Sequence, residues 1–208
     1  MNSNSKDASI ELIPVVIATG NDHKFKEFEQ LLRGVIEPVP QRQFGVPEPE
    51  ETGLTFLENA LLKARHTAKI AGKAALADDS GLVVPALGGA PGIYSARFAG
   101  LQATDADNRA KLLSLMEQVV QRSAYFHASI VYVRSADDPD PIIAQGRWFG
   151  DIARFERGDH GFGYDPIFID RVLGQHAAEL SDDEKNARSH RGQAIQMFLT
   201  QWRILESA

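Results

Sequence analysis

The order of hydrophobic and polar residues predicts alternating strands and helices along most of the chain. Residues 13–18 form a nearly continuous apolar run, which is typical of a strand covered on both faces. After a polar turn, a helix is expected to about Arg33, because one face collects the apolar side chains Phe25, Phe28, Leu31 and Leu32. Gly34 then provides a stop for this helix.

The remainder of the chain continues the same alternation. We expect strands where apolar, aromatic and β-branched residues gather, near residues 35–39, 74–77, 82–87, 124–133, 142–154 and 166–169. Helices are expected after residues that can cap them, over about residues 55–71, 104–120 and 181–188, and a last helix ends near Leu205. The length of 208 residues suits one large domain or two lobes that share a sheet.

Composition limits the partners that the chain can have. It carries 22 Lys and Arg against 28 Asp and Glu, and no basic run could neutralise the phosphates of duplex nucleic acid, so we expect no such partner. The absence of cysteine rules out disulfides and thiolate chemistry, and it fits a cytoplasmic location. No apolar run approaches the ~20 residues of a membrane span. Residues 1–10 are interpreted as a disordered polar tail before a single domain at residues 11–208.

Two adjacent carboxylates are the centre of the candidate chemistry. Asp78 and Asp79 follow a short apolar run and precede Ser80 and Gly81. Neighbouring residues of a strand point to opposite faces, so one aspartate can enter a cleft while the other takes a structural place. A divalent cation or a basic side chain would relieve their repulsion. The same residues also fit an ordinary turn after a strand.

Three further polar stretches offer partners for these carboxylates. Residues 19–24 join a strand to a helix, where backbone N–H groups can bind an anion, although by themselves these residues are more simply explained by helix capping. The glutamates at 48, 50 and 51 suggest a metal site or only a solvated acidic run. Asn59, Lys63 and His66 share one stripe of a helix, which faces either solvent or the wall of a cleft.

Two later stretches combine flexible backbone, rings and cations. Residues 158–165 form a glycine-rich loop with Phe162 and Tyr164, which suits stacking on a nucleobase or a hairpin turn with packed aromatics. Ser189, His190 and Arg191 lie at a helix junction and can present donors to a carbonyl or phosphate. No Gly-x-Ser-x-Gly elbow is present, so a serine hydrolase has little support.

Taken together, these stretches resemble the inosine triphosphate pyrophosphatase family, the house-cleaning dITP/XTP pyrophosphatases of the RdgB/Ham1 type. The resemblance covers about Ile13 to Leu205. It rests on ordered motifs: Ala18-Thr19-Gly20-Asn21-x-x-Lys24, Glu50-Glu51-Thr52-Gly53-x-Thr55-Phe56-x-Glu58-Asn59-Ala60, Ala77-Asp78-Asp79-Ser80-Gly81, Phe162-Gly163-Tyr164-Asp165-Pro166 and Glu184-Lys185-Asn186-x-x-Ser189-His190-Arg191-Gly192.

The resemblance implies an α/β fold with an elongated mixed central sheet flanked by helices, and two lobes with a nucleotide cleft between them, usually in a homodimer. It implies that ITP, dITP and XTP are cut between the α- and β-phosphates, releasing the monophosphate and pyrophosphate. A triphosphate carries about four negative charges and repels hydroxide, so Mg²⁺ and protein cations must offset them.

The resemblance also assigns roles to individual residues. Asp79 is expected to be the general base and a metal ligand, and Glu50 or Glu51 the other ligand. Substrate contacts are expected from the phosphate-binding turn and from the later motifs: Thr19, Gly20, Asn21, Asp22, His23, Lys24, Ser80, Phe162, Gly163, Tyr164, Asp165, Lys185, His190 and Arg191.

Base selectivity follows from hydrogen-bond donors. Hypoxanthine and xanthine carry an acceptor oxygen at position 6, where adenine carries an amino group. Donors from Arg191 or His190 would be left unpaired against adenine, at about 1–3 kcal/mol each, which gives about 10- to 100-fold discrimination. No residue in the sequence explains how the 2-amino group of guanine would be rejected.

Two rival functions use the same residues. A phosphohydrolase with an aspartate nucleophile, like the haloacid dehalogenases, needs Asp-x-Asp spacing, whereas Asp78 and Asp79 are adjacent. A nucleotide-binding sensor without turnover would need only the binding residues. Release of pyrophosphate would indicate the pyrophosphatase, release of orthophosphate the phosphohydrolase, and release of neither the sensor.

Overall fold

The computed structural model describes residues 12–206 and contains a six-stranded mixed sheet in the order β2-β1-β3-β4-β5-β6. β1 pairs in parallel with β2 and β3, while β3, β4, β5 and β6 are antiparallel to their neighbours. The strands are β1 (Ile13–Ala18), β2 (Ile36–Pro40), β3 (Ala75–Val83), β4 (Ser123–Val133), β5 (Ile142–Ile152) and β6 (Phe168–Asp170). The expected elongated, mixed α/β sheet is therefore confirmed.

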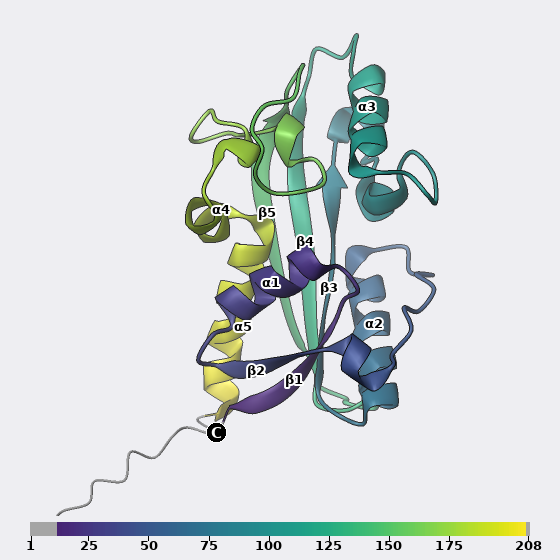
Figure 1. Cartoon of the computed structure of the whole chain (residues 1–208), viewed down its shortest axis with the longest axis vertical. Helices are drawn as coiled ribbons and strands as arrows, with labels where there is room; N and C mark the ends of the chain where they lie inside the picture. Colours follow the sequence, from purple (N-terminus) through teal and green to yellow (C-terminus); the bar gives the residue numbers. More distant parts are fainter. Residues whose placement is uncertain (1–11, 207–208) are drawn as a thin grey trace, which may run out of the picture.

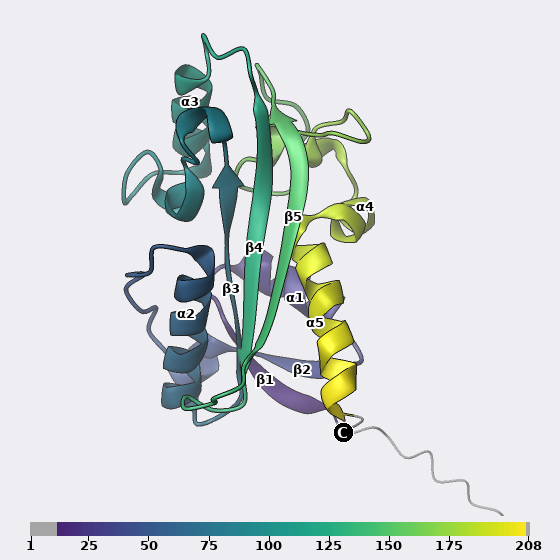
Figure 2. The same ribbon diagram turned by 180° about the vertical axis from the view of Figure 1, so that it is seen from behind.

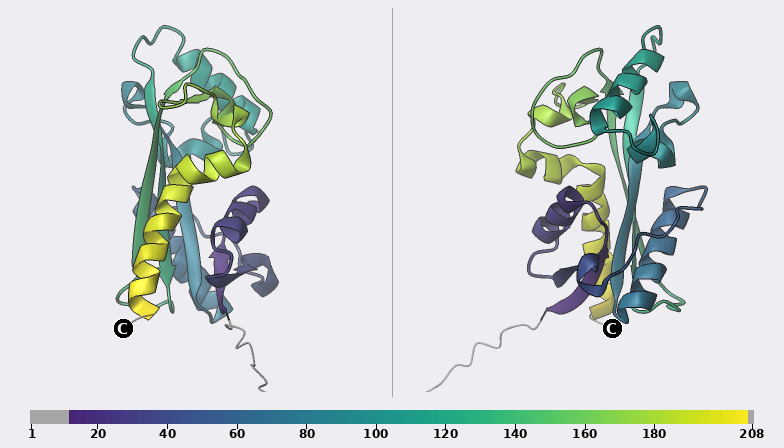
Figure 3. Two further views of the ribbon diagram at one scale, coloured as in Figure 1. Left: turned by 90° about the vertical axis from the view of Figure 1, so that its left-hand side faces the viewer. Right: turned by 45° about the vertical axis from the view of Figure 1, so that its right-hand side comes forward.

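Helices flank both faces of this sheet. They are α1 (Asp22–Leu31), α2 (Phe56–Ala71), α3 (Asp105–Leu115), α4 (Asp182–Arg188) and α5 (His190–Glu206), with 3-10 turns η1 (Gln41–Phe44), η2 (Pro85–Leu87), η3 (Gly92–Arg97), η4 (Asp165–Ile167) and η5 (Ala177–Glu179). β3, β4 and β5 run along the long axis of the molecule, with α1, α2 and α5 beside one half and α3 and α4 beside the other (Figures 1 and 2). Seen from the side, α5 lies along the sheet (Figure 3).

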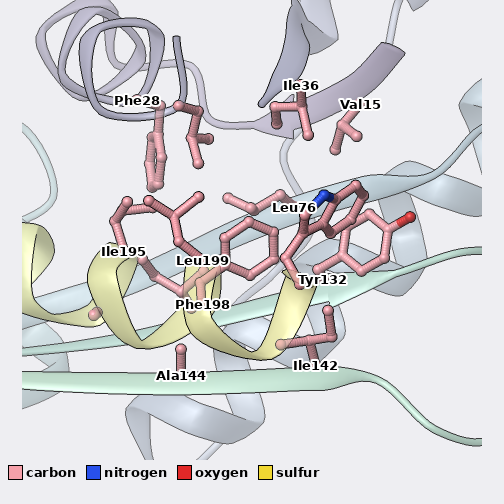
Figure 4. Close-up of a cluster of buried hydrophobic side chains, with 14 of the residues drawn as sticks. Val15, Phe28, Ile36, Leu76, Tyr132, Ile142, Ala144, Ile195, Phe198 and Leu199 are labelled. Atoms are coloured by element: carbon pink, nitrogen blue, oxygen red, sulfur yellow. The ribbon is translucent and has the colours of Figure 1, made fainter. Parts of the chain in front are cut away.

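The alternation of side chains along β4 divides the core between the two faces. Ala128, Ile130 and Tyr132 point to α5 and α1, where they pack against Phe28 and Phe198 (Figure 4). Residues 131 and 133 point to the opposite face and pack with the alanines of α2. A third cluster around Phe126, Trp148 and Phe168 fills the half that carries α3 and α4. Because burial occurs on both faces, β3 and β4 are apolar along much of their length.

β3 does not stop at the two aspartates. It pairs with β4 at every residue from Ala75 to Val83, so the predicted turn at residues 77–81 is wrong, as is a separate strand at residues 82–87. Gly81 lies so close to Gly92 and Ser95 that a Cβ atom would collide with both, which explains a glycine inside the strand. Pro85 begins η2 and ends the strand, because proline cannot donate to a ladder.

Other expected boundaries shift for local reasons. α3 ends at Leu115 rather than near Val120, and Arg122 donates to the carbonyl of Met116 at 2.6 Å in the turn that follows. The strand expected at residues 166–169 starts only at Phe168. The expected tail at residues 1–10 lies outside the described residues. Across residues 12–206, no helix has both the length and the apolar composition needed to cross a membrane.

Candidate active site

A cavity of 540 Å³, the acidic cavity, opens beside the middle of β3. It lies where the loop after β1, the loop before α2 and η3 approach the strand. Its polar lining residues are Thr19, Asn21, Lys24, Glu48, Glu50, Glu51, Lys63, Asp78, Asp79, Ser80 and Arg97. Acids and bases from five segments of the chain therefore converge on one concave surface.

Asp79 points to the α2 face of β3 and binds a lysine. Lys63 Nζ lies 2.6 Å from Asp79 Oδ1 and 3.1 Å from Glu51 Oε1, so one ammonium group joins the two carboxylates. The other oxygen, Asp79 Oδ2, has only a long contact of 3.4 Å with Asn59 Nδ2. Burial raises the pKa of Asp79 above its ordinary value, although Lys63 opposes the rise. Asp79 is thus a carboxylate with one anchored oxygen and one lightly held oxygen.

Asp78 points to the opposite face and serves as a structural anchor. Its side chain is fully buried, and Oδ2 lies 3.0 Å from Lys24 Nζ and 3.1 Å from Arg191 Nη2. Burial alone would raise the pKa of Asp78, but Lys24 and Arg191 outweigh it and hold the pKa far below its usual range. Ser80 Oγ donates to the same oxygen at 3.0 Å. The two aspartates therefore occupy different environments, as expected for neighbours on a strand.

The turn between β1 and α1 caps the helix and also faces the cavity. Asn21 Oδ1 accepts the backbone N–H groups of His23 at 2.9 Å and Lys24 at 3.1 Å, so the capping interpretation is confirmed. Thr19, Asn21 and Lys24 nevertheless line the acidic cavity. Gly20 and Asp22 do not line it: the Gly20 N–H donates to Glu48, and Asp22 pairs with Arg42 at the surface.

A second, smaller cavity of 120 Å³, the aromatic cavity, adjoins the first. The two cavities share Asn21, Lys24, Ser80 and Ala96, which makes one continuous site. The remaining predicted residues that line the aromatic cavity are Phe162, Gly163, Tyr164, Asp165, Lys185, His190 and Arg191. Both interpretations of the glycine-rich loop hold in part, because Phe162 lines the cavity while the buried Tyr164 packs and donates to the Ser95 carbonyl at 2.8 Å.

Buried charges surround the aromatic cavity. Lys185 Nζ lies 2.8 Å from Asp165 Oδ2 and 4.7 Å from the centre of the Phe162 ring. Burial would lower the pKa of Lys185, but Asp165 and Glu27 raise it above its ordinary value. His190 is buried beside Arg191, and burial followed by that positive neighbour holds the pKa of His190 well below its ordinary value. His190 is therefore a neutral ring with a single N–H to donate.

Several residues of the site carried no sequence signal strong enough to assign them. Glu27 of α1 accepts hydrogen bonds from Lys185 at 3.3 Å and from Arg191, although α1 showed only an amphipathic pattern. Arg97 pairs with Glu51 at 2.7 Å. The sequence places Asn59, Lys63 and His66 on one stripe of a helix but does not show whether this stripe faces solvent or a cleft. Asn59 and Lys63 face the site, and His66 bonds the Pro47 carbonyl at 3.0 Å.

The oxygen donors suit a hard cation. Glu51 is half-buried between Lys63 and Arg97, whereas Glu50 is exposed. Within residues 12–206, no three His, Asp or Glu side chains are grouped as a ready-made metal site. Mg²⁺ usually takes one or two carboxylates and completes its shell with water and substrate phosphates, so Asp79 and Glu51 fit that ion.

The fold and the joined cavities define an α/β protein whose site has a cavity of mixed charge at one end and a cavity lined by Phe162 and cations at the other. The Ham1 family model matches residues 15–201, and the chain belongs to the Ham1 family. It is 55% identical over 188 residues to the dITP/XTP pyrophosphatase of Pectobacterium atrosepticum, covering 89% of this chain and 95% of that protein. The Escherichia coli O157:H7 protein of the same name is 54% identical with the same coverage.

Solved structures agree with this assignment. A HAM1 protein from Coxiella burnetii superposes with a TM-score of 0.86 at 48% identity, covering 95% of this chain and all of that one (100%). The Ham1 protein of Staphylococcus aureus gives a TM-score of 0.81 at 37% identity, covering 93% and 98%. The resemblance found in the sequence and the fold expected from it are confirmed. The chain is an enzyme, in the hydrolase class of its curated relatives.

Proposed function

We propose that the chain hydrolyses the deaminated purine nucleoside triphosphates ITP, dITP and XTP to the monophosphate and pyrophosphate, removing them from the nucleotide pool. The observation that carries the proposal is the joining of the acidic and aromatic cavities at Asn21, Lys24 and Ser80. A nucleotide spanning this junction has its phosphates beside Asp79 and its base beside Phe162. The names of the relatives, dITP/XTP pyrophosphatase, support the same substrates.

Asp79 is the proposed general base. Its Oδ1 is anchored by Lys63, so this contact fixes the carboxylate while Oδ2 remains free to accept a proton from water. The raised pKa improves its proton affinity relative to an ordinary aspartate. Water attacks the α-phosphorus, its proton passes to Asp79, and the bond to the bridging oxygen breaks so that pyrophosphate leaves. Lys63 balances negative charge on this side of the cleft.

The remaining residues hold the substrate. Thr19, Asn21 and Lys24 lie at the start of α1 and would contact phosphate oxygens, with Ser80 beside them. Phe162 would stack on the purine, with Lys185 close to the same ring. Arg191 and His190 are the two candidate donors to the base oxygen at position 6. The terminal nitrogens of Arg191 already donate to Glu27, Asp78 and Ser80, whereas its Nε has no hydrogen-bond partner among residues 12–206.

Mg²⁺ is the proposed cofactor, with Asp79 and Glu51 as its protein ligands and Glu50 as the alternative to Glu51. When bound, the ion offsets the charge of the triphosphate and makes the phosphorus more electrophilic. Lys63 would give up part of its contact with both carboxylates, since it now occupies the space between them.

One measurement tests this function. The protein is incubated with ITP and Mg²⁺, and pyrophosphate and orthophosphate are measured separately, with EDTA as the metal control. We expect pyrophosphate alone, lost with EDTA and restored by excess Mg²⁺. Orthophosphate would indicate the aspartate-nucleophile enzyme, and no release with ITP bound would indicate a sensor.

Three further properties belong to the same proposal. We propose a homodimer, a cytoplasmic location, and a single two-lobed domain over residues 11–208. Light scattering of the purified chain measures the first, and limited proteolysis measures the last, with one protected fragment expected.

A further inference from the structure

Phe162 belongs to two cavities at once. It lines the aromatic cavity, and it also lines a cavity of 270 Å³ on the other side of the loop, the outer cavity, together with His23, Lys26 and Glu27. The ring therefore borders open space on part of its surface, and Lys185 Nζ lies 4.7 Å from its centre. A stacking platform is useful only when its orientation is fixed, so other contacts must hold Phe162 in place.

Helix α3 holds the backbone next to Phe162. The Gly163 N–H donates to Asp105 Oδ2 at 2.7 Å, and the Gly163 carbonyl accepts from Arg109 Nη1 at 2.9 Å. The N–H and the carbonyl of Gly163 are thus hydrogen-bonded to two side chains that lie one helical turn apart on α3. The capping box of α3 uses Asp107 rather than Asp105, so the Asp105 carboxylate is available for the loop.

The opposite half of the molecule holds the ring itself. His23, the second residue of α1, stacks on Phe162 with ring centres 5.7 Å apart and an interplanar angle of 21°. His23 lines the outer cavity and not the aromatic cavity, so it contacts Phe162 without lining the space proposed for the base. Its backbone N–H is bonded to Asn21 Oδ1, which fixes it beside the proposed phosphate site.

We propose that Asp105, Arg109 and His23 are positioning residues for base recognition, which hold Phe162 as a prearranged platform from both halves of the cleft. This inference rests on the proposed function. Without them the loop must be ordered when substrate binds, so substrate binding weakens while the hydrolytic step is unchanged. Loss of one of the two hydrogen bonds to Gly163 corresponds to about 2- to 12-fold in affinity.

The test uses the full-length protein and compares base-dependent with phosphate-dependent binding. Pyrophosphate release from ITP gives KM and kcat, calorimetry gives IMP affinity, and inorganic tripolyphosphate serves as a competitive inhibitor without a base. For Asp105→Ala, which removes one hydrogen bond, and for His23→Ala, which removes one ring stack, we expect KM and the Kd of IMP to rise about 2- to 12-fold, with kcat and tripolyphosphate inhibition unchanged. Asp105→Asn keeps an acceptor oxygen and His23→Phe keeps a ring, so both should restore most of the affinity.

Matched controls come from the same helices. Lys111→Ala removes a hydrogen bond from α3 to the Phe98 carbonyl, and Glu29→Ala removes an exposed charge from α1, and neither residue lines the aromatic or the outer cavity. The inference is overturned when Asp105→Ala and His23→Ala keep the wild-type KM, or when kcat or tripolyphosphate inhibition falls with them. His23 is exposed, so its variants test the inference even when Asp105→Ala fails to fold. Absence of pyrophosphate release by the wild type would instead remove the proposed function.

Discussion

Asp78 and Asp79 are adjacent, and replacing each with asparagine should separate catalysis from stability. For Asp79→Asn we expect kcat on ITP to fall by about 10²- to 10⁴-fold, the usual range for a general base. That loss corresponds to about 3–5 kcal/mol of activation free energy. ITP should still bind, because the amide oxygen of the new side chain can accept the Lys63 hydrogen bond that Asp79 Oδ1 accepts at 2.6 Å.

The effect of Asp79→Asn on stability should be small, because two contributions oppose each other. Burial raises the pKa of Asp79, so stability from this group is present at low pH and is lost as pH rises through its folded pKa. The ionised group also pairs with Lys63 at 2.6 Å, and this pair favours folding at pH 7. In Asp79→Asn, Lys63 keeps its ion pair with Glu51.

Asp78→Asn should destabilise the folded protein at neutral pH. The pKa of Asp78 is far below its usual value, so its contribution is present at neutral pH and is lost as pH falls. Its fully buried carboxylate pairs with Lys24 and Arg191, and breaking such a pair costs about 3–5 kcal/mol. At about 2–4 °C per kcal/mol for a chain of this size, Tm should fall by about 6–20 °C.

The two variants are compared by thermal melting and by pyrophosphate release at pH 7. In wild type, kcat/KM should also fall on the acid side at a pH above that of an ordinary aspartate, because protonated Asp79 cannot act as a base. Full turnover by Asp79→Asn would remove the base role. An unchanged Tm for Asp78→Asn would show that its buried pairing does not hold the site together.

Three further predictions follow from the described contacts. Lys24→Ala should raise KM for ITP about 10-fold or more and lower Tm only modestly, since Asp78 keeps Arg191; a variant that does not fold would give Lys24 a structural role. Burial raises the pKa of Asp170, but hydrogen bonds from Arg188 and Trp148 bring it to about 2, so wild-type stability should fall between about pH 4 and pH 2, and Asp170→Asn, less stable at pH 7, should lose part of this dependence in urea titrations while Asp78 retains the rest. Glu51→Gln should raise the Mg²⁺ concentration needed for half-maximal activity more than Glu50→Gln does, and an equal or reversed effect would make Glu50 the ligand.

The sequence predicted most elements because apolar periodicity and capping residues are local signals. The capping boxes at Thr104 and Ser181 form as expected, and α2 ends at Gly72 with its αL conformation. Where the prediction failed, the deciding contact is distant in the chain. Nothing local shows that Gly81 faces Gly92, or that Ser80 lies opposite Ala128 in an unbroken ladder, so a strand through the acidic motif looked like a turn.

The sequence motifs identify many residues of the candidate site, but they do not show which side chains pair with one another. Single residues such as Lys24 and Phe162 lie in short, recognisable patterns, and the structure brings both to the joined cavities. The partners of those residues come from elements with no pattern of their own. Glu27 looks like any polar residue on an amphipathic helix, and its role depends on α1 packing beside Lys185, 158 positions later.

The continuous ladder of β3 has a mechanical consequence. Asp79 and Asp78 lie on a strand that is paired with β4 along its whole length, and β4 is paired in turn with β5. This part of the sheet cannot bend locally without breaking several backbone hydrogen bonds. Adjustment to ligands of different size must therefore come from α1 and the Phe162 loop, while the Asp79 carboxylate keeps its position. Under the proposed function, this arrangement would allow three different substrates to be cleaved at the same bond.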